Sequence, residues 1–452
     1  MYLKRKIDSW LIDWKNKKGK MPALIVGIRQ CGKTKSIQEF GLRNYKNVIE
    51  INFWNNNEYC NIFNGELDVN TIISNISLQF PNDDIKPGST LIFLDEIQEC
   101  PRARLSFKNF AQDGRYDVVG SGSYLGINGY VIGDSSPAPT GYDDVYHMHT
   151  LDFEEFLWAN GYNDNQINFL EECFAQRKKI PDSVHDNYKK LFNKYMCVGG
   201  FPKSVLAYLE NKNIMSAVRE TNNTIFDMKS DFGRRKDKNG EPLFKPAEVA
   251  RIQNAFELIP TFLAKENKRF VVSKILTGKN SEKSDAVEYL RQAHIVHKVY
   301  NLEIPSLPFA GNKIQSQFKL FPEDISIVTS MYGLDTIIAM NNGNLGQGKG
   351  ALYESIVFDS FNKAGIDTYY FAKETGLEID FVICYKGEVY LVEVKARNGN
   401  AKSSKTVMNN PEHYGKTKLL KIGDYNIGED QDILTIPHYL TFILGRREDV
   451  IF

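Results

Sequence analysis

Apolar runs alternate with helical segments over residues 22–150 of this chain. Five short runs rich in β-branched residues have the length and flanking residues of strands. They are Ala23–Val26, Val48–Ile51, Thr90–Leu94, Asp117–Val119 and Val145–His149. Strands that alternate with helices in this way predict an α/β domain with a parallel sheet and helices on both faces. A turn-rich loop is expected at Gly133–Gly141, before the fifth strand.

The first segment of the chain, residues 2–18, has the pattern of an amphipathic helix. Its apolar residues at helical spacing are Leu3, Ile7, Trp10, Leu11 and Trp14, and the basic residues at other positions are Lys4, Arg5, Lys6, Lys15, Lys17 and Lys18. Such a helix can lie on a membrane or pack on the following domain. Packing is the favoured interpretation.

The chain after residue 150 changes character several times. A helical pattern over residues 151–230 is followed by a charged linker at Asp231–Pro246, and short helices then lead into a strand that suits a winged helix. A flexible joint is expected at Asn341–Gly350, before a helix and a hairpin. The predicted divisions are an N-terminal helix (1–20), an α/β domain (21–150), a helical region (151–230), a winged-helix-like region (231–310) and a C-terminal domain (311–452).

Composition limits the class of protein. A length of 452 residues suggests about three domains, and 42% apolar with 25% charged residues is ordinary for a globular protein. Because Lys+Arg and Asp+Glu both total 56, a surface that binds nucleic acid must be a local patch. Six cysteines without paired spacing indicate neither a zinc module nor a disulfide framework. With no long apolar run, and with Asp8 and Asp13 interrupting the N-terminal segment, a cytoplasmic protein is expected and a membrane partner is not.

A complete GxxxxGKT motif spans Gly27–Thr34, directly after the first strand and before a helical segment. Its glycines allow successive N–H groups to turn inward and cradle phosphate at a helix N-terminus. Lys33 would reach the β- and γ-phosphates, and the Thr34 hydroxyl would bind Mg²⁺. The expected cofactors are therefore ATP and Mg²⁺. The residues expected to bind them are Gly27, Ile28, Arg29, Gln30, Cys31, Gly32, Lys33, Thr34, Lys35 and Asp95.

Two further strands end in polar residues suited to this chemistry. The third strand ends in Asp95 and Glu96; Asp95 would help to hold Mg²⁺, and Glu96 would orient and deprotonate the attacking water. The fourth leads into Ser121 and Ser123, where a hydroxyl could sense the γ-phosphate, although a plain polar loop would read the same way. Cys31 lies within the loop; a helix N-terminus can make a thiol reactive, but a passive position is the favoured interpretation.

The most informative C-terminal stretch is Glu378–Lys395. With Lys386-Gly387 as a two-residue turn, Asp380 faces Glu393 and Glu378 faces Lys395. Facing Cβ atoms lie roughly 4.5–5.5 Å apart, so the two acids could share a divalent cation, and without one they would repel. Lys395 would lie beside the same site, where it could activate water or stabilise a pentavalent phosphate. The alternative is a solvated hairpin with a plain Glu378–Lys395 ion pair.

Six stretches follow one another as in a known prokaryotic family: GIRQCGKTK, FLDEIQECPRA, GSGSYLG, LDFEEFLWANG, VGGFPKSV and the hairpin with Asp380, Glu393 and Lys395. Over nearly its whole length the chain resembles AAA+ P-loop ATPases that carry a C-terminal restriction-endonuclease-like, or PD-(D/E)xK, domain. The resemblance implies a parallel-sheet ATPase core, a helical lid, a winged-helix-like region and an α/β nuclease-like domain.

The resemblance also implies roles for single residues. Lys33 and Thr34 would form Walker A, Asp95 and Glu96 Walker B, and Ser121 or Ser123 sensor 1. In the nuclease-like domain, Glu354 would be an acidic residue of the site, on the helix before the hairpin. Glu354, Asp380 and Glu393 would hold Mg²⁺ or Mn²⁺, with Glu354 and Lys395 as catalytic residues.

One departure concerns a sensor arginine. Similar proteins often have Gly-Arg where this chain has Gly141-Tyr142. Arg102, Arg104 or Arg115 could replace it, including across the interface of a homo-oligomer. The leading hypothesis is an ATPase whose nucleotide state controls a metal-dependent nuclease acting on DNA. The alternatives are a nucleotide switch that binds nucleic acid or a protein without cleavage, and a membrane-associated scaffold.

Overall fold

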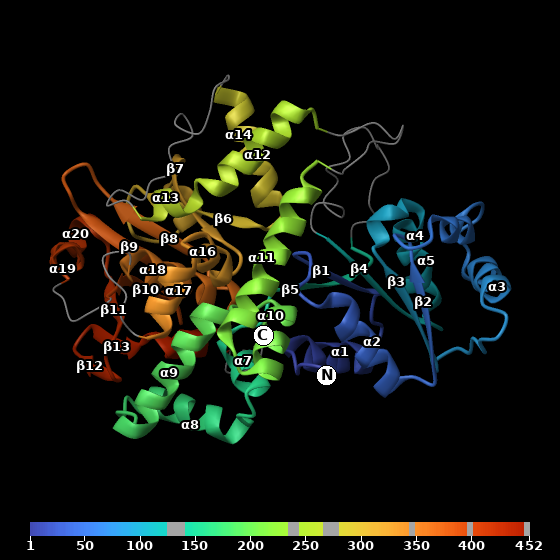
Figure 1. Ribbon diagram of the computed structural model, residues 1–452, viewed down its shortest axis with the longest axis horizontal. Coiled ribbons are helices and arrows are strands. Elements are labelled where there is room, and N and C mark those ends of the chain that lie inside the picture. The colour runs from blue at the N-terminus through green and yellow to red at the C-terminus, as the bar shows by residue number, and fades with distance from the viewer. Residues whose placement is uncertain (124–140, 234–243, 265–279, 343–348, 396–400, 447–452) are drawn as a thin grey trace. The chain divides into compact units, whose positions relative to one another are not determined.

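The five apolar runs of residues 22–150 form five parallel strands in this computed structural model, which describes residues 1–123, 141–233, 244–264, 280–342, 349–395 and 401–446. The strands are β1 (Ala23–Gly27), β2 (Asn47–Asn52), β3 (Thr90–Asp95), β4 (Asp117–Gly122) and β5 (Asp144–Met148). Their order in the sheet is β2-β3-β4-β1-β5 (Figure 1). The predicted parallel sheet is confirmed, whereas the expected loop at Gly133–Gly141 lies outside the described residues apart from Gly141.

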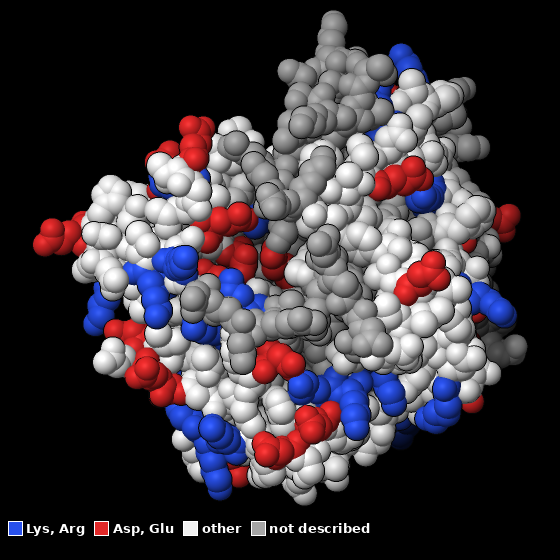
Figure 2. Space-filling view, turned by 60° about the vertical axis from the view of Figure 1, so that its left-hand side comes forward, with Lys and Arg blue, Asp and Glu red and all other residues white. Residues whose placement is uncertain are grey.

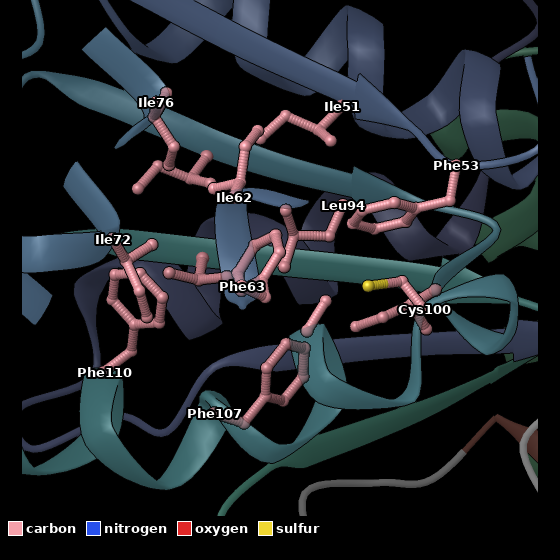
Figure 3. Packing of buried hydrophobic residues seen from close by; sticks show 14 of the residues in the cluster. Ile51, Phe53, Ile62, Phe63, Ile72, Ile76, Leu94, Cys100, Phe107 and Phe110 are labelled. Atoms are coloured by element: carbon pink, nitrogen blue, oxygen red, sulfur yellow. The ribbon is translucent and has the colours of Figure 1, made fainter. Parts of the chain in front are cut away.

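Helices cover both faces of this sheet. They are α1 (Lys6–Asn16), α2 (Lys33–Asn44), η1 (Asn57–Phe63), α3 (Val69–Gln79), η2 (Ile97–Glu99), α4 (Pro101–Leu105) and α5 (Phe107–Asp113). On one face, Leu94 packs with Phe63 of η1 and Phe107 of α5 in a buried cluster (Figure 3). On the other face α2 approaches closely at Gly41, where a Cβ would lie 3.1 Å from Leu91 Cδ2. Leu91 and Leu94 point to opposite faces of the sheet because side chains alternate along a strand.

The N-terminal helix packs on this sheet domain. Ile7, Leu11 and Trp14 of α1 are buried, and the Trp14 indole donates to the Met21 carbonyl at 2.8 Å. Packing, rather than membrane association, therefore accounts for the apolar stripe of this helix. Among the described residues, no helix has the length and apolar character needed to span a bilayer.

The chain divides into two compact units. The first consists mainly of Met1–Thr150, and the second mainly of Leu151–Phe232, Pro246–Arg291 and Ile295–Phe452. The end of the first unit coincides with the predicted end of the α/β domain. Most of the expected linker at Asp231–Pro246 and of the expected joint at Asn341–Gly350 lies outside the described residues.

The second unit begins with a run of helices. This run, where a helical lid was expected, contains α7 (Phe153–Ala159), α8 (Asp164–Ala175), α9 (Asp182–Val198), α10 (Pro202–Asn211) and α11 (Ile214–Asp231). The later helices are α12 (Pro246–Glu257), α13 (Ile259–Leu263), α14 (Asn280–Gln292), α15 (Phe309–Asn312), α16 (Ile325–Met331), α17 (Leu334–Asn341), α18 (Lys349–Lys363), α19 (Lys402–Met408), α20 (Pro411–Tyr414) and η4 (His438–Gly445).

A mixed sheet of eight strands forms the core of the second unit. The strands are β6 (Val296–Leu302), β7 (Lys313–Pro322), β8 (Thr368–Ala372), β9 (Glu378–Tyr385), β10 (Glu388–Val394), β11 (Lys418–Gly423), β12 (Gly428–Asp430) and β13 (Ile433–Pro437), in the order β12-β13-β11-β10-β9-β8-β6-β7. The strand expected to end the winged-helix-like region is β6. It pairs with β7 and β8, so the predicted boundary at residue 310 separates strands of one sheet.

The predicted hairpin is present with its expected register. Lys386 and Gly387 have φ values of 50° and 77°, the left-handed pair that a tight two-residue turn requires. Tyr385 pairs with Glu388, and the ladder continues to Phe381 opposite Val392. One further step along this register places Asp380 opposite Glu393.

Candidate functional site

The phosphate loop connects the end of β1 to the start of α2. Gly32 has a φ of 102° and Gln30 a φ of 64°, so the loop makes two left-handed turns before the helix begins at Lys33. Gly27 has no room for a side chain, since a Cβ there would lie 2.3 Å from the Met148 carbonyl oxygen. The loop therefore has the left-handed bends that turn backbone N–H groups toward an anion at a helix N-terminus.

Lys33 lies over this loop. Its side chain is buried, and its ammonium donates to the carbonyls of Gly27 and Ile28, both at 3.0 Å. The neighbouring Lys35 is exposed on α2. Cys31 is fully buried, with its sulfur 4.0 Å from the Lys33 nitrogen, which supports the passive interpretation of this cysteine.

Asp95 ends β3, and side chains from the neighbouring strands β2 and β4 contact it. Its carboxylate accepts hydrogen bonds from Thr34 at 3.1 Å, from Asn52 at 2.9 Å and from the Ser121 hydroxyl. Burial raises the pKa of Asp95, the hydrogen bond from Ser121 opposes this, and the charge of Glu96 adds to the increase. Thr34 and Asp95 thus lie together as ligands for Mg²⁺ must, and the oxygen donors fit that ion.

Glu96 directly follows Asp95 in an unusual backbone conformation. Its φ is 52°, a left-handed value that is uncommon outside glycine, and its carboxylate accepts a hydrogen bond from Gln98 at 2.5 Å. Of the two serines expected to sense nucleotide, Ser121 is engaged by Asp95. Ser123 is buried, and its hydroxyl has no hydrogen-bond partner among the described residues.

The three arginines suggested as a replacement sensor all have partners within the first unit. Arg102 donates to the carbonyls of Phe63 and Gly65, Arg104 pairs with Asp143, and Arg115 pairs with Asp113. None of these contacts directs an arginine to the phosphate loop.

Three further residues of the site were not identified from the sequence. Asn52 could have been found, because it ends β2 directly beside Asp95 in the parallel register. For Gln98, the sequence offered no indication of a role in the site apart from its place in the DEIQ stretch. Arg5 was expected on the polar side of the N-terminal helix, yet it is only 5% exposed and contacts the phosphate loop.

A second group of charged residues surrounds the hairpin of the second unit. A pocket of about 320 Å³ is lined by Glu378, Asp380, Glu393, Lys395, Lys402 and Ser403. The four hairpin residues that were predicted to face one another in pairs therefore all line one pocket. Lys402 and Ser403, both on α19, were not predicted.

The acids of this pocket have protein partners. Glu393 pairs with Lys395 at 2.6 Å and accepts a hydrogen bond from Ser404 at 2.5 Å, while Asp380 accepts from the Val394 backbone at 2.8 Å. Burial lowers the pKa of Lys395, but the hydrogen bond and charge of Glu393 outweigh it, so the pKa is raised overall. Lys395 thus relieves much of the expected repulsion between the facing acids.

The plain Glu378–Lys395 ion pair, which was the alternative to a metal site, does not form. Glu378 instead pairs with Lys319 at 3.3 Å. The reason is that β10 ends at Val394, and the Lys395 backbone N–H bonds to the Ile422 carbonyl of β11 rather than continuing the ladder with β9.

Glu354 lies on α18 and is buried. Burial lowers the pKa of Lys395, and the charges of Glu393 and Asp380 raise it. The negative charge of Glu354 adds a smaller increase. Within the described part of the chain, no three His, Cys, Asp or Glu side chains lie close enough to hold a metal ion. A metal shell of Glu354, Asp380 and Glu393 stays a prediction.

Comparison with known proteins divides the chain into three parts. Residues 19–157 match the model of an AAA domain, residues 189–337 match a domain of unknown function (DUF8612), and residues 349–439 match another (DUF4143). No curated protein matches by sequence.

Two solved structures resemble the chain at low identity. One is the Walker-type ATPase PABY2304 of Pyrococcus abyssi, with 12% identity, a TM-score of 0.42, and coverage of 73% of this chain and 96% of that one. The other is the Aeropyrum pernix ORC2 protein in ADPNP–ADP complexes, with 12% identity, a TM-score of 0.35, and coverage of 76% and 94%.

The AAA model covers the phosphate loop and every strand that carries a residue of the nucleotide site. The first unit is therefore a P-loop ATPase domain of the AAA type, and it binds nucleotide.

Proposed function

We propose that this chain hydrolyses ATP at the phosphate loop and that its nucleotide state controls a metal-dependent phosphodiesterase site in the hairpin pocket, which acts on DNA. The observation that carries the first part is the convergence of Thr34, Asn52 and Ser121 on the Asp95 carboxylate. Asp95 is a buried acid next to Glu96, with β4 between its strand and β1, which leads into the loop, and this arrangement supports ATP hydrolysis.

The residues of the nucleotide site have different roles in the proposed hydrolysis. Backbone N–H groups hold the phosphates, and Lys33 exchanges its bonds to Gly27 and Ile28 for the outer phosphates. Glu96 orients the attacking water and accepts its proton. Thr34 and Asp95 would hold Mg²⁺, which when bound neutralises charge on the phosphates.

The proposal for the second unit rests on the pocket at the hairpin. Asp380 and Glu393 both line it, and Lys395 and Lys402 supply positive charge in the same pocket. Acids and bases are intermixed on the face of the molecule in Figure 2. Lys395 and Lys402 would attract a phosphodiester to the pocket itself. Asp380 and Glu393 would hold Mg²⁺ or Mn²⁺, with water molecules completing the coordination shell.

A second candidate function is a nucleotide switch whose hairpin pocket binds DNA or a protein without cutting it. The observation that favours it is the Glu393–Lys395 pair at 2.6 Å, because this pairing stabilises the acid without a metal ion. Cleavage requires this pair to open, whereas binding does not.

The deciding experiment measures cleavage of single-stranded DNA, duplex DNA and RNA with Mg²⁺ or Mn²⁺, each with and without ATP. We expect cleavage that depends on metal and ATP in the parent, and its loss in both Lys33→Ala and Asp380→Asn. We expect Asp380→Asn to retain ATP hydrolysis and Lys33→Ala to lose it.

The outcomes separate the parts of the proposal. ATP hydrolysis at the parental rate in Lys33→Ala would show that the loop is not the catalytic site. DNA binding without cleavage by the parent under every condition would establish the switch in place of the nuclease.

A further inference from the structure

Arg5 connects the N-terminal helix to the phosphate loop. It precedes α1, its side chain is 5% exposed, and its guanidinium donates through one nitrogen to the Cys31 carbonyl at 2.8 Å. A second nitrogen of the same group donates to the His149 carbonyl at 2.7 Å, just beyond β5. A planar, always charged group thus bridges the loop and the end of a sheet strand.

The position of Arg5 is fixed by its own surroundings. Its backbone N–H donates to the Asp8 carboxylate at 3.0 Å, and the Asp8 N–H returns a bond to the Arg5 carbonyl at 3.1 Å. Leu3 and Ile7 are buried on either side of it. The arginine therefore extends from a well-defined helix start, and few alternative positions are open to its guanidinium.

The bond to Cys31 acts on a peptide group that phosphate binding uses. The carbonyl of Cys31 and the N–H of Gly32 belong to one planar, trans peptide, so they point in opposite directions. When Arg5 holds this carbonyl, the Gly32 N–H is held pointing away from the arginine. Gly32 has a φ of 102°, and a glycine in this region is otherwise free to change its backbone angles.

We propose that Arg5 is a positioning residue for nucleotide binding: it fixes the Cys31–Gly32 peptide so that the Gly32 N–H is directed at the phosphates. Arg5 touches the loop from behind and does not contact the nucleotide. Its charge also adds to the positive potential of the loop, together with Lys33. This inference rests on the proposed nucleotide site and deepens it.

The proposal predicts which ligands depend on Arg5. The loop cradles the inner phosphates of a di- or triphosphate, whereas AMP makes fewer contacts there. Loss of the arginine should therefore weaken ADP and ATP binding and have little effect on AMP. A general loss of structure would instead weaken all three, so the ratio of ADP to AMP affinity separates positioning from folding.

The test uses the full chain and measures equilibrium binding of ADP, ATP and AMP with Mg²⁺, with steady-state ATP hydrolysis alongside. In Arg5→Met, which keeps the buried stem and removes the donors, we expect ADP affinity to fall about ten- to a hundredfold and the ADP:AMP ratio to fall with it. We expect the KM for ATP to rise by a similar factor while kcat changes less than about threefold, because the lost contact holds substrate and transition state alike.

Two further variants make the test decisive. Arg5→Lys keeps the charge but cannot bridge both carbonyls, so an intermediate decrease is expected even if Arg5→Met fails to fold. Arg102→Met is the matched control for stability, because Arg102 also bridges two backbone carbonyls, those of Phe63 and Gly65, away from the loop. It should lower the melting temperature and leave the ADP:AMP ratio unchanged.

The possible failures are distinct. If the parent binds ADP and both Arg5 variants keep its ADP:AMP ratio, the positioning role is wrong and the nucleotide site stands. If the parent binds neither ADP nor ATP, the proposed function itself fails, and the role of Arg5 fails with it.

Discussion

Single side chains at the ends of three adjacent strands form the nucleotide site. Asn52 ends β2, Asp95 ends β3 and Ser121 lies near the end of β4, and the parallel register brings all three together. The Asp95 carboxylate accepts hydrogen bonds from Thr34, Asn52 and Ser121, whereas the Glu96 carboxylate accepts one from Gln98 in its own turn. In the proposed mechanism, Asp95 therefore stays in place and Glu96 acts as the base.

We expect Glu96→Gln to separate nucleotide binding from hydrolysis. The substitution keeps the shape of the side chain but removes the base, so turnover should fall by about 10²-fold or more while ATP remains bound. Single-turnover kinetics and retention of labelled ATP measure the two effects. Glu99→Gln, an exposed acid three residues further on, is the control and should behave as the parent does. Loss of ATP binding in Glu96→Gln would indicate a structural role for this acid.

The residues of the site that were predicted are those with a local pattern. Lys33, Thr34 and Asp95 follow strands that can be read from the sequence, so their meeting is a consequence of the parallel sheet. Arg5 has no such pattern. In the sequence alone, an arginine that is buried and bonds to backbone carbonyls cannot be distinguished from the other basic residues of an amphipathic helix. The choice between Ser121 and Ser123 also required coordinates, since both lie around the end of the same strand and, of the two, Ser121 bonds to Asp95.

At the scale of elements, sequence patterns predict strands better than they predict sheets. The turn at Lys386-Gly387 determines the pairing of β9 with β10, because both partners are local. The place of β6 depends on β7 and β8, and β8 is about 70 residues away in the sequence. The same limit explains Glu378, whose partner Lys319 lies on a distant strand.

We expect Asp380→Asn to show whether the hairpin acids form a metal site. Removing one of two facing charges should raise stability without metal by a few tenths to about 1 kcal/mol, with Lys395 keeping the gain small. Mn²⁺ or Mg²⁺ should stabilise the parent and not the variant. Melting curves in EDTA and in Mn²⁺ measure both effects, with Glu388→Gln, outside the pocket, as the control. An identical response to metal in parent and Asp380→Asn would mean that these acids bind no cation.

A buried ion cluster joins α16 to α18 and makes stability depend on pH. The Lys363 ammonium lies 2.9 Å from Asp359 and 3.1 Å from Asp324, and all three side chains are almost fully buried. One cation cannot neutralise two carboxylates. Burial raises the pKa of Asp359 to about 7, because the charge of Asp324 and the lack of water outweigh the attraction of Lys363.

The sign of the resulting pH dependence follows from this increase. Asp359 has a higher pKa in the folded state than in the unfolded chain, where it is about 3.9, so its contribution to stability is present at low pH and lost as pH rises to about 7. Asp359→Asn keeps the neutral form at every pH. Relative to the parent, the free energy of unfolding of the variant should therefore increase between pH 5 and pH 8, by roughly 1 kcal/mol or more.

Urea unfolding at several pH values measures this difference. Exposed Asp335 on α17 provides a matched substitution, and Asp335→Asn should differ from the parent by the same amount throughout. A difference between Asp359→Asn and the parent that does not change with pH would mean that Asp359 is ionised in the folded state from pH 5 upward.

At the scale of the whole molecule, an ATPase domain and a charged pocket occupy separate units of one chain. The first unit carries the AAA match, and the pocket lies within the 349–439 match of the second. Each unit has its own sheet and its own buried core, so each can respond to its own ligand. Control of one by the other is the part of the proposed function that requires a signal to pass between them.

We expect that signal to be visible as nucleotide-dependent hydrogen exchange in the hairpin. In Glu96→Gln, which holds ATP without hydrolysing it, ATP and Mg²⁺ should slow exchange in the phosphate loop, residues 27–34, because bound phosphates engage its N–H groups. If nucleotide controls the pocket, exchange in β9 and β10 should change at the same time, since a ligand shifts a second site only by altering its conformational equilibrium. Lys33→Ala, which should not hold the outer phosphates, is the control and should show neither change. Protection of the loop in Glu96→Gln without any response in the hairpin would separate the two activities and leave the pocket independent of ATP.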